Sequence, residues 1–299
     1  MPPARWTPAE IPDQSGRHLV ITGGNSGIGF EAARMLAGAG ARVTLAVRDV
    51  AKGERAAAEI DGAVDVRELD LSRLDSVRAF AAATTEPVDV LVNNAGVMAV
   101  PFSRTAEGFE LQFGTNHLGP FALTNLLLPR ITDRVVTISS GAHRMGRLDF
   151  DDLNWERRPY RRWKAYGQSK LANLLFTLEL ERRLSAAGSP VRALAAHPGY
   201  SATNLQFHSG NRVVDRVMSV LNRVVGQSAA MGALPTAYAV TQDLPGGSYV
   251  GPDGPNEIRG YPTLVGRSAA ASDVGLAQRL WTASEELTGV RFPAEIATA

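Results

Sequence analysis

The chain has 299 residues, of which 44% are hydrophobic and 20% charged, with a formal net charge of +1 and no cysteine. A charge so near zero gives no support to a polyanionic partner, so nucleic acid is not expected, and the lack of cysteine excludes disulfides, thiolate metal sites and cysteine nucleophiles. Residues 1–14 are rich in proline and have no apolar run, so we expect a flexible segment in a cytoplasmic protein, without a signal peptide or transmembrane segment.

Short apolar runs alternate with helical patterns through the first third of the chain. Strands are predicted at residues 18–22, 41–47, 64–69 and 88–92, and helices at 30–39, 50–60 and 74–83. Such alternation is typical of an α/β protein in which a parallel sheet carries helices on both faces. We therefore predict a Rossmann-type doubly wound parallel sheet, in a single domain that extends over residues 15–299.

The first strand runs into a glycine-rich turn and then into a helix. A helix that begins in this way presents free backbone N–H groups and the positive end of its dipole, which suits a pyrophosphate. A plain tight turn is the alternative interpretation. The predicted phosphate-binding residues are Gly23, Asn25, Ser26, Gly27, Ile28 and Gly29.

Two further strands end in charged residues that would face a bound dinucleotide. Arg48 follows the strand 41–47, where an arginine would pair with the 2′-phosphate of NADP and an acid would hold the free hydroxyl of NAD. Asp49 comes next, so a shift of one residue would reverse the choice; we expect NADP(H), with NAD(H) as the alternative. Asp70, followed by Leu71, would accept a hydrogen bond from the adenine amino group, unless Asp70 or Ser72 caps the next helix.

Tyr166 and Lys170 stand four residues apart at the head of an apolar helical pattern, and therefore on one face of the predicted helix. Two unit charges about 5 Å apart interact by about 3 kcal/mol at an effective dielectric of roughly 20. The lysine is expected to lower the pKa of the phenol by roughly two units from near 10, so that the phenol can exchange a proton with an alcohol or a carbonyl. The alternative is a packed ring beside a solvated amine.

Three motifs in this order resemble those of the short-chain dehydrogenase/reductases: Thr22-Gly-Gly-Asn-Ser-Gly-Ile-Gly29, Asn93-Asn-Ala-Gly96 and Tyr166-x-x-x-Lys170. Within that family the chain is similar to the branch of retinol dehydrogenases and WW-domain oxidoreductases, over roughly residues 15–290. The resemblance implies an NAD(P)-dependent enzyme acting on CH–OH donors, with no metal. It adds to the cofactor-binding residues Asn93, Ala95, Gly96, Tyr166 and Lys170.

The same resemblance implies roles for two polar residues outside these motifs. Asn116 would prop open a helix and hold a water that relays protons to Lys170. Ser140 would be the hydrogen-bond partner of the substrate oxygen, with Ser139 as the alternative if the strand register is shifted. The expected catalytic residues are therefore Asn116, Ser140, Tyr166 and Lys170.

The resemblance also implies how the site would work. As hydride leaves the nicotinamide for a carbonyl carbon, Ser140 and Tyr166 would stabilise the charge that builds on the oxygen. A turn at Pro198 and Gly199 would lead to Thr203, which would reach the nicotinamide carboxamide.

Two segments are expected to choose the substrate. The insert at residues 141–165 carries a run of arginines. These arginines either attract an acidic group of the substrate or form a solvated loop edge. It also carries His143, either a substrate contact beside Ser140 and Tyr166 or, as we prefer, a brace for the insert. Residues 211–226 have an apolar helical stripe, and the resemblance implies that 204–226 form a lid over the substrate; core packing and attachment to a membrane surface are the alternatives. An apolar lid favours a lipophilic substrate.

The leading hypothesis is an NADP-dependent oxidoreductase that transfers hydride between the nicotinamide and a carbonyl or alcohol of a retinal-, steroid- or aldehyde-like substrate. One alternative is a double-bond reductase similar to protochlorophyllide reductase, although those enzymes use cysteines and this chain has none. Another is a non-catalytic NADP(H)-binding redox sensor or scaffold. By analogy with the family, we expect a homodimer or homotetramer that associates through helices at 109–129 and 168–184.

Overall fold

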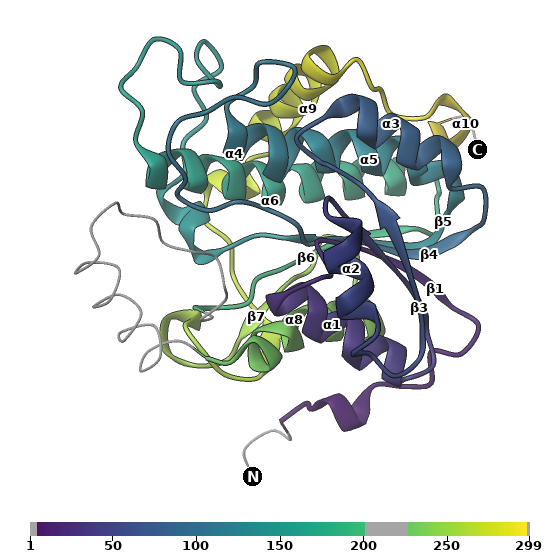
Figure 1. Ribbon diagram of the computed structural model, residues 1–299. Coiled ribbons are helices and arrows are strands. Elements are labelled where there is room, and N and C mark those ends of the chain that lie inside the picture. The colour runs from purple at the N-terminus through teal and green to yellow at the C-terminus, as the bar shows by residue number, and fades with distance from the viewer. Residues whose placement is uncertain (1–4, 201–226, 298–299) are drawn as a thin grey trace.

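The computed structural model describes residues 5–200 and 227–297, which form an α/β fold around one eight-stranded sheet (Figure 1). The strand order is β3-β2-β1-β4-β5-β6-β7-β8, and every neighbouring pair is parallel except β7 and β8. The strands are β1 (His18–Thr22), β2 (Arg42–Val47), β3 (Ala63–Glu68), β4 (Val88–Asn93), β5 (Ile131–Ile138), β6 (Arg192–Ala196), β7 (Tyr249–Pro252) and β8 (Pro262–Leu264). The predicted fold class is confirmed.

Helices cover both faces of the sheet because alternate residues of its strands are apolar on both sides. In β1, Leu19 and Ile21 pack with residues of one helical layer, whereas Val20 packs with the other. The first layer contains α1 (Gly27–Gly38), α2 (Val50–Ala57) and α8 (Ala229–Thr241). The second contains α3 (Leu74–Ala83), α5 (Gly119–Leu127) and α6 (Arg162–Ala186), with the short α4 (Leu111–Phe113) before α5.

The helix that we expected at 109–129 is interrupted. Between α4 and α5, residues Gly114–Leu118 form a π-helical turn, in which the N–H of Gly119 bonds to the carbonyl of Gly114. Such wide turns are frequent at functional sites.

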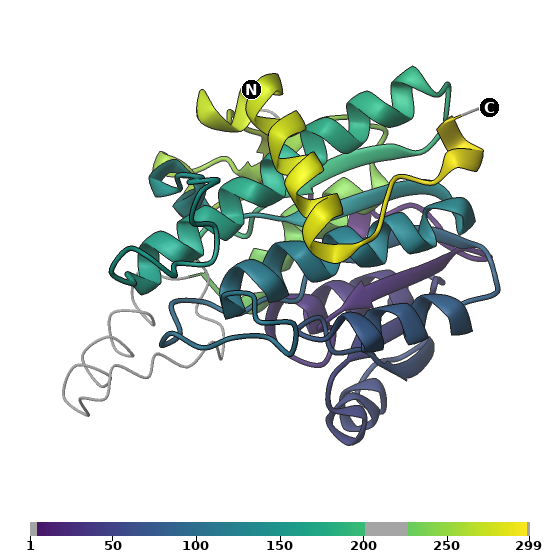
Figure 2. The same ribbon diagram turned by 90° about the horizontal axis from the view of Figure 1, so that it is seen from above.

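The C-terminal helices lie outside the second layer, where α9 (Val274–Thr288) crosses over α5 and α6 and the short α10 (Ala294–Ala297) follows (Figure 2). The ring of Trp281 stacks on Phe176 of α6 with centroids 5.8 Å apart and meets Phe121 of α5 edge-on at 4.9 Å. The helices through which association was expected are therefore covered by the chain's own α9. The homodimer or homotetramer stays a prediction, and it would need another surface or a displaced α9.

The described part of the N-terminal segment differs from what its composition predicts. Residues 5–14 are not a loose tail, because Trp6 is buried against α8, with its ring centroid 5.2 Å from that of Tyr238. One large ring supplies enough apolar area to hold a segment whose composition otherwise favours disorder. The helix α9 is capped by Asp273, whose carboxylate accepts from the N–H of Leu276 at 2.9 Å.

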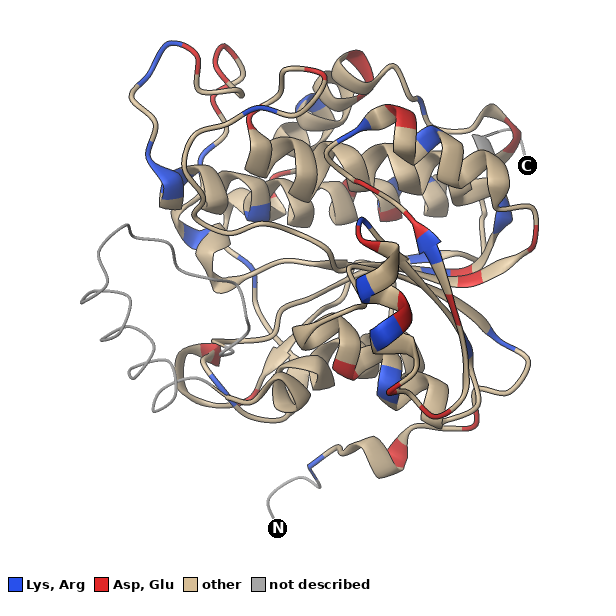
Figure 3. Ribbon diagram, in the orientation of Figure 1, with Lys and Arg blue, Asp and Glu red and all other residues tan. Residues whose placement is uncertain are grey.

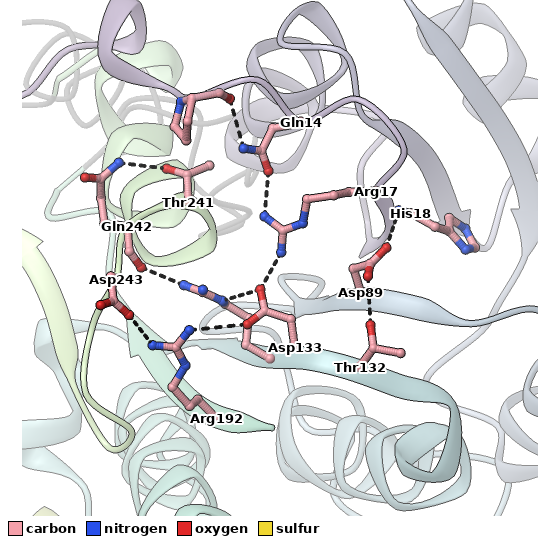
Figure 4. Close-up of polar contacts among 12 residues, drawn as sticks. Gln14, Arg17, His18, Asp89, Thr132, Asp133, Arg192, Thr241, Gln242 and Asp243 are labelled. Carbon is pink, nitrogen blue, oxygen red and sulfur yellow. Dashed lines mark hydrogen bonds and ion pairs between the residues drawn. The ribbon is translucent and has the colours of Figure 1, made fainter. Parts of the chain in front are cut away.

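A polar cluster joins the amino ends of three strands, at the edge of the sheet opposite to the glycine-rich turn (Figure 4). Asp133 of β5 accepts from Arg17, Arg134 and Arg192, and Arg192 also pairs with Asp243 beyond α8. Burial lowers the pKa of Arg134, whose guanidinium also donates to two backbone carbonyls. The cluster therefore fastens this edge, while the strands' carboxyl ends stay available for a ligand.

Replacement of Trp281 by alanine should lower the free energy of unfolding by about 3–5 kcal/mol, because a fully buried ring that contacts both α5 and α6 would leave a cavity. The measurement is urea denaturation followed by circular dichroism. Gln278→Ala, an exposed position on the same helix, should change stability by less than about 0.5 kcal/mol. Equal stability of the two variants would show that α9 does not hold the second layer together.

Candidate active site

A cleft of about 440 Å³ opens at the carboxyl ends of the central strands. It lies where the strand order reverses between β1 and β4, the position at which open α/β sheets bind ligands. Of the predicted cofactor-binding residues, those that line it are Gly23, Asn25, Ser26, Gly27, Ile28, Gly29, Arg48, Asp70, Leu71, Ala95, Gly96, Tyr166, Lys170 and Pro198.

The glycine-rich turn fits the phosphates of a dinucleotide. Gly23 and Gly27 have φ angles of 67° and 57°, a region that favours glycine. A Cβ on Gly29 would lie 2.6 Å from the carbonyl oxygen of Gly23, so only glycine allows the turn to close on the start of α1. The first N–H groups of this 12-residue helix have no acceptor within the helix and point out of its start.

The end of β2 separates the roles of two adjacent charged residues. Asp49 caps α2, and its carboxylate accepts from the backbone N–H of Lys52 at 2.9 Å. Arg48 is exposed, lines the cleft and has no hydrogen bond or ion pair within the part of the chain that the structure describes. The side chain of Lys52 lines the same end of the cleft. Two cations and a helix start therefore converge where the adenosine ribose would lie.

Asp70 lies in the cleft but its carboxylate is partly occupied. Its Oδ1 accepts from the backbone N–H and the hydroxyl of Ser72, at 2.9 and 2.6 Å. Neither residue caps α3, whose N-cap is Arg73. Asp70 thus holds a turn with one oxygen, and its Oδ2 has no bond among the described residues and is free to accept from a ligand.

The two asparagines after β4 have different orientations. Asn93, a predicted cofactor-binding residue, is buried and donates to Thr124 Oγ1 at 2.9 Å, so its side chain does not line the cleft. Asn94 lines it instead and donates to the carbonyl of Thr22 at 2.8 Å. The two side chains point in different directions because a one-residue difference at a strand end reverses the direction of the side chain. A role of Asn93 in cofactor binding stays a prediction.

Other lining residues were missed because no motif marks their positions. Among them are Lys52, Val97, Met98, Thr115 and Ile138. The Oγ1 atom of Thr115 is buried and has no hydrogen-bond partner among the described residues. A polar group of a bound cofactor would satisfy this orphan, which is consistent with a dinucleotide in the cleft.

Asn116 lies in the π-helical turn and does not line the cleft. Its side-chain amide accepts from the N–H of Val97 at 2.7 Å and donates to the carbonyl of Val97 and to Ser169 Oγ, both at 2.9 Å. The side chain therefore ties the wide turn to the loop after β4 and to α6. The family role of propping a helix open fits these contacts, and the water relay stays a prediction.

The two serines after β5 also have separate roles. Ser139 is buried, and its hydroxyl donates to the backbone carbonyl of Lys170 at 2.9 Å, which fixes α6 to the strand. Ser140 lies beside Tyr166, where its hydroxyl lowers the pKa of the phenol by hydrogen bonding. Of the two alternatives, the geometry therefore favours Ser140 as the partner of a substrate oxygen.

Tyr166 and Lys170 are close, as the spacing predicts, but the expected effect on the phenol was wrong. The ammonium lies 5.7 Å from the centroid of the Tyr166 ring and donates to the carbonyl of Ile138 at 3.0 Å. Burial raises the pKa of Tyr166 to about 12 and lowers the pKa of Lys170 to about 8. Loss of hydration penalises both charged forms, and outweighs their attraction. At neutral pH the phenol is therefore protonated and the lysine charged.

His143 is a brace rather than a substrate contact. Its Nδ1–H donates to the carbonyl of Ser140 at 2.7 Å, and its Nε2 accepts from the N–H of Ser268 at 3.3 Å. Both ring nitrogens are thus used by backbone groups, and the ring is buried. Its inclusion among the substrate residues was wrong.

The predicted nicotinamide turn is described only in part. Pro198 lines the cleft, and Gly199 adopts a φ of 65°, with no room for a Cβ beside the carbonyl of Ile258. Thr203 and the predicted lid at 204–226 lie outside the described residues.

Comparison with known proteins identifies the family. A model of the short chain dehydrogenase family matches residues 17–212, and the chain belongs to that family. Human retinol dehydrogenase 13 is 42% identical over 296 residues, which cover 93% of this chain and 86% of that protein. An uncharacterized protein from Mycobacterium paratuberculosis has a crystal structure with a TM-score of 0.86, 56% identity and coverage of 97% and 100% of the two chains.

A more distant structure bears on the cofactor. The 3-ketoacyl-(acyl-carrier-protein) reductase from Brucella melitensis, complexed with NADH, is 25% identical, with a TM-score of 0.59 and coverage of 79% of this chain and 96% of that one. Family and fold together make the present chain a nicotinamide-dependent oxidoreductase that acts on alcohols or carbonyls.

Replacement of Tyr166 by phenylalanine should lower kcat by about 10²–10⁴-fold, because the proton donor is lost while the ring and the cleft stay in place. The affinity for the nicotinamide cofactor, measured by fluorescence titration, should be unchanged. Tyr238→Phe removes the same hydroxyl from α8, away from the cleft, and should have normal kcat. Normal turnover of Tyr166→Phe would show that the proton donor has been misidentified.

The rate of carbonyl reduction should fall as the pH rises through about 8. Lys170 has a lowered pKa of about 8, so its ammonium is present below that pH and lost above it, whereas Tyr166 keeps its proton to about pH 12. The quantity to measure is kcat/KM for the cofactor, which reports ionisations of the free enzyme. Lys170→Arg keeps its charge and should move the decline to higher pH. A flat profile to pH 10 would contradict the assignment.

Proposed function

We propose that the chain is an NADP-dependent reductase or dehydrogenase of lipophilic carbonyl compounds and alcohols. The choice of NADP rests on the different roles of the two charged residues that follow β2. Asp49 is committed to the start of α2, whereas Arg48 faces the cleft without a partner in the described residues and has Lys52 beside it. A 2′-phosphate would neutralise both cations, whereas the adjacent acid that could hold a 2′-hydroxyl, Asp49, already has one carboxylate oxygen bonded to the start of α2.

The residues of the site support reduction of a carbonyl in the protonation states that they have at neutral pH. The phenol of Tyr166 holds a proton that it can donate to a carbonyl oxygen, and Ser140 offers a second hydrogen bond to that oxygen. The charged Lys170 then stabilises the tyrosinate that is left. A bound NADPH would supply the hydride to the carbonyl carbon, and oxidation of an alcohol would use the same residues in reverse.

Apolar surfaces around the catalytic end support a lipophilic substrate. Val97 and Met98 line the cleft beside Gly96. Tyr200 and Ile258, which are joined by a backbone hydrogen bond of 2.7 Å, are both exposed just beyond Pro198. A hydrocarbon chain or ring would cover such surfaces favourably, whereas a polar molecule would lose hydrogen bonds there. The names of the retinol dehydrogenase relatives are consistent with this class.

Replacement of Arg48 by alanine should raise KM for NADPH by about tenfold to a hundredfold, as expected for the loss of a charge-assisted hydrogen bond of about 1.5–3 kcal/mol. KM for NADH should change little, because NADH has no 2′-phosphate. Lys52→Ala should show the same direction with a smaller effect. Arg55→Ala, an exposed position on α2 that does not line the cleft, serves as the control. Equal effects on both cofactors would remove the NADP assignment.

The activity itself is tested by following NADPH oxidation with a panel of retinal, a steroid ketone, a long-chain aldehyde and a short polar aldehyde. We expect turnover of the first three, with a lower kcat/KM for the short aldehyde. Binding of NADPH without turnover of any carbonyl would contradict the proposal and favour a non-catalytic redox sensor.

A further inference from the structure

Three large apolar side chains are exposed together around the start of α6. Phe102, Met145 and Trp163 are 43%, 43% and 40% exposed. Phe102 packs edge-on against Tyr160, three residues before Trp163, with ring centroids 5.1 Å apart. Met145 lies against Gly167, one turn beyond Trp163 on α6. These three side chains, with the cations around them, are called the aromatic-basic patch.

The surrounding insert carries an excess of positive charge. Residues 141–165 contain seven arginines and lysines against four acidic residues, although the whole chain has a net charge of only +1. The acids are largely committed: Asp149 and Asp152 pair with Arg158, and Glu156 pairs with Arg104. The exposed cations without an ion pair in the described residues are Arg147, Arg157, Arg161, Arg162 and Lys164. Figure 3 shows Lys and Arg at the start of α6 and along the neighbouring loop.

The insert that carries Met145 and Trp163 is held in place by polar and aromatic contacts. The carboxylate of Asp152 accepts from the backbone N–H groups of Glu156 and Arg158 at 2.6 and 3.1 Å. The guanidinium of Arg158 lies 3.9 Å from the centroid of the Trp155 ring. The hydroxyl of Tyr160 donates to the buried Glu110 at 2.9 Å. The insert is therefore fastened to the loop before α4, and its apolar side chains are exposed although the support is well packed.

We infer that the aromatic-basic patch docks on the surface of an anionic lipid bilayer. Tryptophan and phenylalanine prefer the membrane interface, where an apolar ring is covered and polar groups stay wet. Clustered arginines and lysines are attracted to the negative potential of acidic lipids. Neither property alone identifies a surface, but here five cations with no ion pair among the described residues belong to the insert that carries Met145 and Trp163, and Phe102 packs against Tyr160 of the same insert.

Such docking would bring the mouth of the catalytic cleft toward the bilayer. Trp163 precedes Tyr166 by three residues on α6, and the centroids of the two rings are 6.1 Å apart. The inference does not depend on the proposed substrate class, because attachment to lipid needs neither cofactor nor turnover. No helix among residues 5–200 and 227–297 is long and apolar enough to cross a membrane, so the contact would lie at the surface.

The test is sedimentation of the full chain with vesicles of phosphatidylcholine alone and of phosphatidylcholine with about one third phosphatidylserine. We expect the protein to sediment with the anionic vesicles and to stay in solution with the neutral ones. The tryptophan emission should shift to the blue on binding, and this signal reports Trp163, because the chain's other three tryptophans, Trp6, Trp155 and Trp281, are buried.

The decisive variant is Arg161→Glu with Arg162→Glu, which should lower partitioning onto anionic vesicles by at least about 30-fold, given roughly fivefold for each lost cation near the surface. Acids at the first positions of α6 favour that helix, so the variant should fold. The control, Arg55→Glu with Arg291→Glu, makes the same change in net charge at exposed positions on α2 and after α9, and should bind as the parent does.

Three results would overturn the inference. They are equal sedimentation with neutral and anionic vesicles, equal losses in the two double variants, and anionic binding without a change in the emission of Trp163. Absence of vesicle binding, with capture instead by an acidic protein, would also reject a lipid surface. Loss of carbonyl turnover with vesicle binding intact would concern the proposed activity alone.

Discussion

The bond between the Lys170 ammonium and the carbonyl of Ile138 holds the catalytic end of the molecule together. That carbonyl is the last of β5, and Asn173, one turn further along α6, also donates to it at 3.0 Å. Ser139 returns a bond from the strand to the helix backbone. Sheet and helix are thus joined by three buried hydrogen bonds around one charge, so the phenol of Tyr166 is held by the same packing that forms the core. The contacts that fix the position of the phenol are therefore the same ones that hold the Lys170 charge beside it.

Burial, more than pairing, sets the protonation of this site. An attraction of about 3 kcal/mol was expected between phenolate and ammonium at an effective dielectric of roughly 20. Yet the pKa of Lys170 falls from 10.5 to about 8 through burial, which corresponds to about 3 kcal/mol against the charged amine. A cost of that size cancels the expected gain. The free protein therefore holds its proton on the phenol, a state suited to donating it.

The sequence predicted the order and kind of the central elements, because alternating apolar runs and glycine punctuation are local signals. It located α3 to the residue and found the cleft through its glycines. It failed where the outcome depends on which way one side chain turns. Asn93 and Asn94 have the same chemistry, and only the twist at the end of β4 decides that the second one faces the cleft. The contacts of His143 with Ser268 and of Asp133 with Arg17 likewise join segments more than 100 residues apart, which no local pattern encodes.

The position of α9 has a consequence for how the protein is made. Trp281 and Ser284 contact Phe121, Phe176 and His117, so the second helical layer is completed by α9, which follows the last strand of the sheet. A ribosome would release β1 to β4 and their helices long before those residues emerge. The nascent chain would therefore carry a nucleotide-binding half beside exposed aromatic rings on α5 and α6 until α9 emerges. Chaperones that shield apolar surface would have their main role in that interval.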